Sequence, residues 1–337
     1  MINAELEASH AAVSRGFEVL KFDQATLEKI TLPECETVEH SDLVSVRFAR
    51  FGNQDAPHQI IETAPYLTSI EDPHYKIRLF VQQKLLGENV SVIGVQPFDP
   101  KHADLSGPER KKVANGNFSP ISDRILRVAE HLGIERAFAY GQSMGADVST
   151  QLTYDATNDA NRGTLAIDAL GALEPARVES RGPIKVAKAM AKSGKLLFKN
   201  VWDSDLPALY EAWDIDPEGD FDKQKKAFDS AVNKGGTKYM LASLGSNIAL
   251  TRGFGTSESR RQLNAIVREG KTFVMLGRQS LSEVCTSEFV DHMQNRHQDR
   301  PNFDSYTDEG DHSDDDNPVR SAGRLRHFVA KASADKS

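Results

Sequence analysis

The feature that most constrains the fold is a regular alternation of short apolar runs with longer segments of helical spacing. The clearest strand pattern is NVSVIGVQ, residues 89–96, whose Val and Ile content is typical of a strand buried on both sheet faces. Residues 119–131 have helical spacing, begin with Ser-Pro and end before Gly133. Strands separated by helices of about 12 residues pair in parallel. The sequence therefore predicts an α/β fold, a mainly parallel twisted sheet with helices on both faces.

Similar patterns place the other elements. Further strands are predicted within residues 42–52, 57–67, 136–140, 164–173, 271–277 and 302–310, and further helices within 3–20, 75–86, 144–154, 287–297 and 318–333.

One interval interrupts the alternation. Residues 177–259 are rich in Lys, Ala, Leu and Asp and contain both tryptophans, but they show no convincing strand pattern. We predict a helical insertion there, between the sixth and seventh strands of the sheet. Residues 1–39 then form a helical leader and a first strand, and residues 40–176 and 260–337 form the core.

Composition limits the classes of function. The chain has 337 residues, of which 39% are hydrophobic, enough for a sizeable core. A formal charge of −8 argues against nucleic acid as the main partner, because phosphate binding relies on clustered Lys and Arg. Cys35 and Cys285 alone make no disulfide framework, which favours a reducing compartment. No apolar signal segment or membrane-spanning run is present, so we expect a cytoplasmic protein without a membrane span.

Residues 141–145 read Gly-Gln-Ser-Met-Gly, between a predicted strand and a predicted helix. This context makes the G-x-S-x-G pattern typical of a nucleophilic serine on a strained turn, which needs small neighbours because the chain passes close by. The helix N-terminus would stabilise a developing oxyanion, and the Met144 backbone N–H is the predicted donor. The alternative is an ordinary tight turn marked by glycines.

A serine hydroxyl requires a base, usually a histidine oriented by a carboxylate. Among the ten histidines, His312 lies in a loop after the last predicted strand, at the sheet edge expected to carry Ser143. We therefore predict His312 as the base. The acidic residues around it lack the ligand spacing of a calcium loop, so no metal is predicted.

The Ser143 turn and the G-x-H loop of His312 together resemble the α/β-hydrolase superfamily, in the order serine, acid, histidine. The resemblance covers roughly residues 40–175 and 260–335, with the insertion where that family often carries a helical cap. It implies a serine-dependent hydrolase or transferase, without a cofactor, that acts on a small molecule bearing an acyl group.

The acid departs from the family pattern. Relatives commonly carry Asp three residues after the glycine that closes the seventh strand, whereas Ser280 follows Gly277 here. Glu283 is the nearest carboxylate and the predicted acid. The alternative is Glu174, since some relatives take their acid from the end of the sixth strand. Asp168 is a weaker alternative because it lies inside the apolar run.

The oxyanion loop departs as well. Many relatives have His-Gly after the third strand, but this chain reads IIETAPYLTS, and Pro65 has no N–H to donate. The Tyr66 backbone is the predicted second donor, and failing that Leu67. Candidate pocket residues are Leu67, Gln142, Trp202 and Trp213.

The leading hypothesis is hydrolysis of a carboxylic ester, and less readily of an amide or thioester, through an acyl-enzyme on Ser143 with His312 as general base. One alternative is an acyltransferase similar to the homoserine acyltransferases. The other is a hydrolase-fold binding protein without catalysis, which Ser280 and Pro65 would explain. The sequence leaves the oligomeric state open, a homo-oligomer included.

Overall fold

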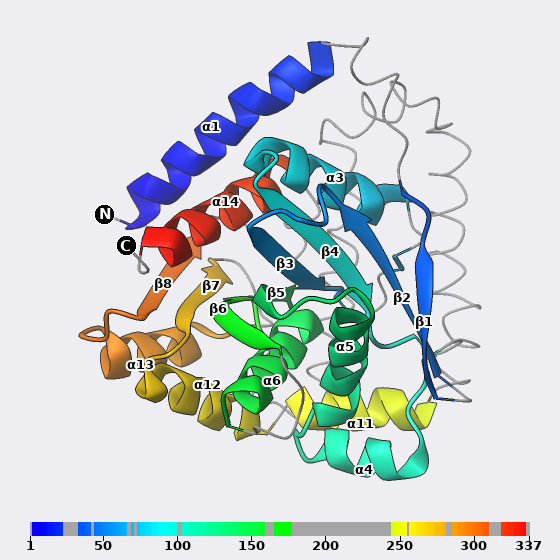
Figure 1. Cartoon of the computed structure of the whole chain (residues 1–337). Helices are drawn as coiled ribbons and strands as arrows, with labels where there is room; N and C mark the ends of the chain where they lie inside the picture. Colours follow the sequence, from blue (N-terminus) through cyan, green and yellow to red (C-terminus); the bar gives the residue numbers. More distant parts are fainter. Residues whose placement is uncertain are drawn as a thin grey trace, which may run out of the picture.

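The computed structural model describes residues 2–22, 33–41, 44–65, 69–70, 73–99, 103–158, 165–176, 244–254, 256–280, 285–309 and 318–334. Within them, the strands form one sheet in the order β1-β2-β4-β3-β5-β6-β7-β8 (Figure 1). The strands are β1 (Glu36–Ser41), β2 (Val44–Phe51), β3 (His58–Thr63), β4 (Val90–Gln96), β5 (Arg136–Gln142), β6 (Ala166–Leu173), β7 (Phe273–Gln279) and β8 (Phe303–Asp308). Only the β1–β2 and β2–β4 pairs are antiparallel. The predicted fold class is confirmed.

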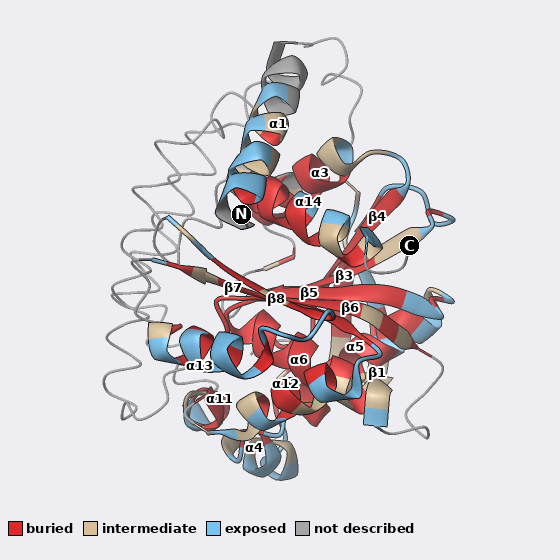
Figure 2. Ribbon diagram, turned by 90° about the vertical axis from the view of Figure 1, so that its left-hand side faces the viewer, coloured by how far each residue is buried: buried red, intermediate tan, exposed pale blue. Residues whose placement is uncertain are grey.

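Helices cover both faces of the sheet (Figure 2). One face carries α1 (Ile2–Phe22), α3 (Pro73–Leu86) and α14 (Pro318–Ala334). The other carries α5 (Ser119–His131), α6 (Met144–Asn158), α12 (Glu258–Glu269) and α13 (Ser287–His297), with α4 (Gly107–Ala114) and α11 (Leu244–Phe254) farther from the sheet. The sheet therefore separates two buried layers, and its strand ends form an edge between them.

The central strand β4 shows why the apolar pattern predicted this arrangement. All of its residues are buried, with Val92 in the core under α3 and Ile93 in the core under α5. A Cβ atom added to Gly94 would collide with the side chain of Leu79, so α3 packs directly onto the strand at this position. Burial on both faces is what the run of Val and Ile in this segment predicts.

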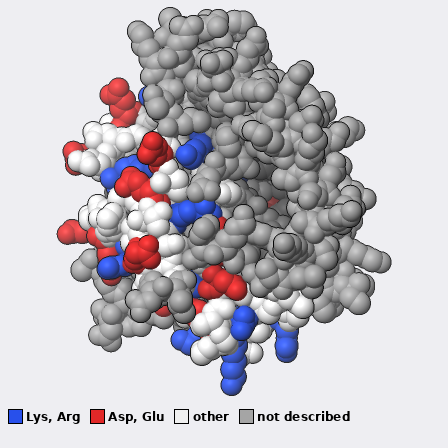
Figure 3. All heavy atoms as spheres, turned by 90° about the vertical axis from the view of Figure 1, so that its right-hand side faces the viewer, with Lys and Arg blue, Asp and Glu red and all other residues white. Residues whose placement is uncertain are grey.

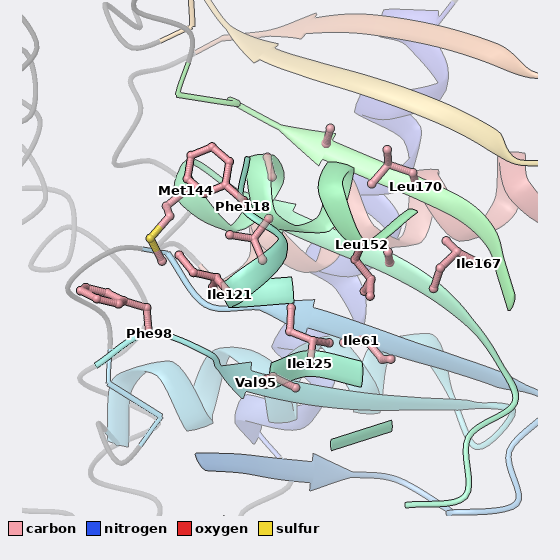
Figure 4. Packing of buried hydrophobic residues seen from close by; sticks show 14 of the residues in the cluster. Ile61, Val95, Phe98, Phe118, Ile121, Ile125, Met144, Leu152, Ile167 and Leu170 are labelled. Atoms are coloured by element: carbon pink, nitrogen blue, oxygen red, sulfur yellow. The ribbon is translucent and has the colours of Figure 1, made fainter. Parts of the chain in front are cut away.

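The larger core lies between the sheet and the α5/α6 layer (Figure 4). Ile61 and Val95 from the strands and Ile125 from α5 belong to it, together with Leu152 from α6. Toward the carboxyl ends of the strands the same cluster includes Met144. Apolar packing therefore reaches the first residue of α6 and holds the start of that helix against the sheet.

On the part of the surface in Figure 3 that the structure describes, basic and acidic side chains are interspersed. Among the described helices, none combines the length and apolar character that crossing a membrane requires.

Three details differ from the sequence predictions. Helices α4 and α12 were not predicted, although Ser106 and Glu109 form a capping box at the start of α4. Strand β1 runs past residue 39, the predicted end of the leader. Of the predicted insertion, the described part is mainly α11, which is helical and packs against α4. The rest of the insertion, with Trp202 and Trp213, lies outside the described residues.

The contact between α1 and the end of β8 predicts an acid-sensitive stability. Burial lowers the pKa of His10 to about 4, and Arg324 and Arg320 add to this effect while Asp308 opposes it. An unfolded histidine titrates near pH 6.5, so the unfolded chain binds more protons than the native one between about pH 6.5 and 4. Stability should fall as the pH falls through this window, with His10 contributing about 2 kcal/mol of the loss.

Urea denaturation of wild type and His10→Gln between pH 7 and pH 4 measures this contribution. The variant should lose less free energy of unfolding than wild type over that range. Equal losses in the two proteins would contradict the assignment.

Candidate active site

Ser143 is the residue between β5 and α6, and its backbone has φ 55. L-residues other than glycine rarely adopt this left-handed conformation, which costs roughly 1–2 kcal/mol. Among the described residues only Ser143 and Glu174 combine a side chain with a positive φ. Such strain persists only where the surroundings enforce it, and it concentrates at functional sites.

The two glycines that flank Ser143 have no room for side chains. A Cβ atom on Gly141 would lie closer than 3.0 Å to the backbone of Gly145, and one on Gly145 would lie as close to the carbonyl oxygen of Thr63. Because the obstructing atoms belong to the backbone, no side-chain rotation can relieve the collision. The prediction that the turn requires small neighbours is confirmed.

Hydrogen bonds fix the turn to the strands on either side. The Ser143 amide donates to the Leu173 carbonyl of β6 at 3.0 Å, and the Ser143 carbonyl accepts from the Ala146 amide at 3.0 Å. On the other side, the Ser149 hydroxyl of α6 lies 2.9 Å from the Thr63 hydroxyl of β3. The first amides of a helix have no intrahelical acceptor, so the Met144 amide suits the oxyanion role predicted for it.

Glu174 occupies the equivalent position on the next strand. Gln142 and Leu173 are paired in register, so Ser143 and Glu174 directly follow paired residues. Glu174 has φ 49, and its side chain is fully buried. Its amide donates to the Gly277 carbonyl at 2.8 Å, and its carboxylate accepts a short hydrogen bond from the Gln279 amide. The alternative acid is thus a fixed, buried carboxylate one strand away from the serine.

Neither a protein-family model nor a curated protein matches the sequence. Solved structures do match it over most of its length. The α/β-hydrolase enzyme MGS-M2 from a Medee basin deep-sea metagenome library has a TM-score of 0.55 at 12% identity, covering 88% of this chain and 97% of that chain. A carboxylesterase structure from the ammonia-oxidizing thaumarchaeon Nitrososphaera gargenis has a TM-score of 0.53 at 16% identity, covering 89% of this chain and 100% of that chain. Bromoperoxidase from Bacillus anthracis has a TM-score of 0.54 at 11% identity, with coverage of 89% and 100%.

The chain has the α/β-hydrolase fold. In this fold the strand-to-helix turn after β5 corresponds to the nucleophile elbow, where a serine is exposed to substrate on a strained turn. The position of Ser143 in the sheet therefore agrees with the motif in the sequence.

Several predicted site residues lie outside the described residues: Glu283, His312, Tyr66, Leu67, Trp202 and Trp213. In the sequence, His312 falls between the end of β8 and the start of α14, and Glu283 falls between β7 and α13. Both intervals follow the carboxyl ends of strands that run parallel to β5, as the sequence analysis expected.

Asp168, the weaker alternative for the acid, lies at the wrong edge of the sheet. Its carboxylate accepts a hydrogen bond of 3.2 Å from Arg136, the first residue of β5, whereas Ser143 follows the last residue of that strand. At the other edge, Asp308 accepts from Arg324 at 2.8 Å. Among the described residues, no group of His, Cys, Asp or Glu could hold a metal ion.

Gln142 was predicted to line the pocket, and its side chain makes a contact that the sequence did not indicate. Its carboxamide oxygen accepts from Arg78 of α3 at 3.4 Å. Arg78 also donates a short hydrogen bond to Glu62 of β3. The one local signal was Glu62 itself, a charged residue inside an apolar strand, because nothing in the sequence connects α3 with the end of β5.

The strain at Ser143 predicts an unusual order of stabilities. Ser143→Gly should be more stable than Ser143→Ala by about 1 kcal/mol, because glycine adopts a positive φ without steric cost. Urea denaturation of the two variants measures the difference. Ser149 in the middle of α6 is the matched control, where alanine should be the more stable replacement by about 1 kcal/mol. The same order at both positions would contradict a strained elbow.

Proposed function

We propose that the protein is a serine hydrolase that cleaves carboxylic esters through an acyl-enzyme on Ser143. The observation that carries this proposal is the left-handed backbone of Ser143, at a strand-to-helix turn whose flanking glycines have no room for a Cβ atom. A structural turn does not need a serine at a strained position, since glycine would fit there without cost. Solved carboxylesterases with the same fold support the reaction class.

In the proposed reaction, the Ser143 hydroxyl oxygen attacks the acyl carbonyl carbon while His312 takes the hydroxyl proton. The amides of Met144 and Tyr66 stabilise the resulting oxyanion. His312 then gives its proton to the leaving alcohol as the carbon–oxygen bond breaks. A water molecule, deprotonated by His312, attacks the acyl-enzyme, and the acid is released as Ser143 regains its proton.

Glu174 is the proposed acid that orients His312, with Glu283 as the alternative. Its carboxylate is fully buried, and the Gln279 amide holds it at the edge of the sheet where the elbow lies. Its strained backbone indicates that the fold maintains this placement at a cost in free energy. A carboxylate so fixed can hold the histidine tautomer and stabilise the imidazolium that forms during attack.

Labelling with a fluorophosphonate probe, measured by intact mass, tests the nucleophile. Wild type should gain one label, because His312 activates the Ser143 hydroxyl, and Ser143→Ala and His312→Ala should gain none. Ser257→Ala is the control, since Ser257 is exposed at the start of α12 and should not affect labelling. A folded wild type that takes no label would contradict the proposal and favour a binding protein.

A pair of isosteric variants tests the acid. Glu174→Gln should lower kcat for p-nitrophenyl acetate by about 10³-fold to 10⁴-fold, because the amide no longer holds the required tautomer of the histidine. Glu283→Gln should leave kcat within about twofold of wild type, a change within the ordinary range for a residue outside the triad. The thermal midpoint serves as the folding control, since glutamine can still accept from the Gln279 amide. The reverse pattern would assign the acid to Glu283.

A further inference from the structure

A buried charged cluster lies beneath the nucleophile elbow, on the α3 side of the sheet (Figure 2). It consists of Glu62 in β3, Arg78 in α3 and Gln142 at the end of β5, which are 1%, 2% and 6% exposed. The Arg78 guanidinium donates to the Glu62 carboxylate through one nitrogen and to the Gln142 carboxamide oxygen, at 3.4 Å, through another. It also lies over the Tyr75 ring, 4.6 Å from its centroid.

Stability alone does not account for a charged pair at this place. Moving two charges out of water is costly, and apolar side chains of similar volume often stabilise a fold equally well or better. The surrounding residues of this layer are mainly apolar and would accommodate such a replacement. What the pair provides, and an apolar pair would not, is a directional hydrogen bond to the residue before Ser143.

The cluster joins the two chain segments that the proposed reaction has to align. Glu62 is paired in register with Tyr140, so β3 and β5 are neighbours at this level of the sheet. After Glu62, β3 leads through Thr63 toward the segment that contains Tyr66, the proposed second oxyanion donor. After Gln142, β5 leads directly into Ser143. Arg78 bridges the two strands just before both segments begin.

We propose that Arg78 is a positioning residue for Ser143, a role that rests on the proposed function. By holding the Gln142 side chain, Arg78 limits rotation of the backbone that leads into the strained turn, and through Glu62 it fixes that backbone relative to β3. The negative charge of Glu62 offsets the charge of Arg78, so the effect is one of geometry. Lysine cannot replace it, because a single ammonium group lacks the planar fork that reaches two acceptors.

The rate of fluorophosphonate labelling and the kcat and KM for p-nitrophenyl acetate test this role, with the thermal midpoint as the measure of folding. Arg78→Lys should lower the labelling rate and kcat by about 10-fold to 100-fold, the loss typical of a nucleophile displaced by about 1 Å, and should leave KM within about twofold. Gln142→Met should give the same loss. The combination of both substitutions should lose no more than either alone, because they break one interaction.

Two further variants separate positioning from stability. Glu62→Gln combined with Arg78→Met removes both charges, so it avoids an unpaired buried charge if Arg78→Lys does not fold. This folded double variant should show the same loss of rate. Gln82→Met is the matched control: Gln82 is fully buried one turn along α3 and donates to Ser321 of α14 at 2.8 Å, without a contact to the elbow. It should lower the thermal midpoint and leave the labelling rate unchanged.

Each result decides the matter. If wild type is labelled and the folded Arg78 variants are labelled at the same rate, Arg78 has no positioning role and the proposed function stands. If Gln82→Met loses as much rate as Arg78→Lys, the effect belongs to α3 packing in general and the proposal is overturned. If wild type itself takes no label, the proposed function fails and the role of Arg78 fails with it.

Discussion

The contact of Gly145 with the carbonyl of Thr63 is the constraint on which the rest of the edge depends. It brings the first turn of α6 against the end of β3, although α6 is connected to β5. Only a sharp turn lets the chain leave β5 and start a helix at that distance, and the left-handed backbone of Ser143 provides this turn. The N-terminus of α6 therefore lies above the two central strands, where its free amides and its dipole favour an anion.

Backbone hydrogen bonds carry this fixed point outward along the edge of the sheet. The amide of Ser143 donates to the last residue of β6, and the amide of Glu174 donates to Gly277 in β7. The amide of Ser280, which follows β7, donates to Asp308 at the end of β8. Each turn after a strand is thus bonded to the next strand. The segments that contain Glu283 and His312 therefore start from points whose spacing the sheet determines, even though they are far apart in the sequence.

The two faces of the sheet serve this edge in different ways. Under α5 and α6 the core is apolar up to Met144, so it holds the helix by packing. Under α3 and α14 there are buried ion pairs, and each lies near a strand end that leads toward the proposed site. Arg78 pairs with Glu62 beneath the elbow, and the fully buried Arg324 pairs with Asp308 at the end of β8. Directional bonds thus occur where a strand end has to be held in one orientation, and they are costly to lose because the groups are buried.

This division also explains what the sequence could predict. The glycines around Ser143, the Val-rich run of β4 and the helix stop at Gly87, which has φ 90, are local patterns, and all three were interpreted correctly. Glu174 was identified by its place after a strand, but its strain was not, because a positive φ at a glutamate is imposed by bonds to β7. The Arg78 contact depends on how α3 crosses the sheet, and no pattern within either segment encodes that. Local chemistry thus indicated the nucleophile, whereas the groups that hold it in place are set by the packing of distant segments.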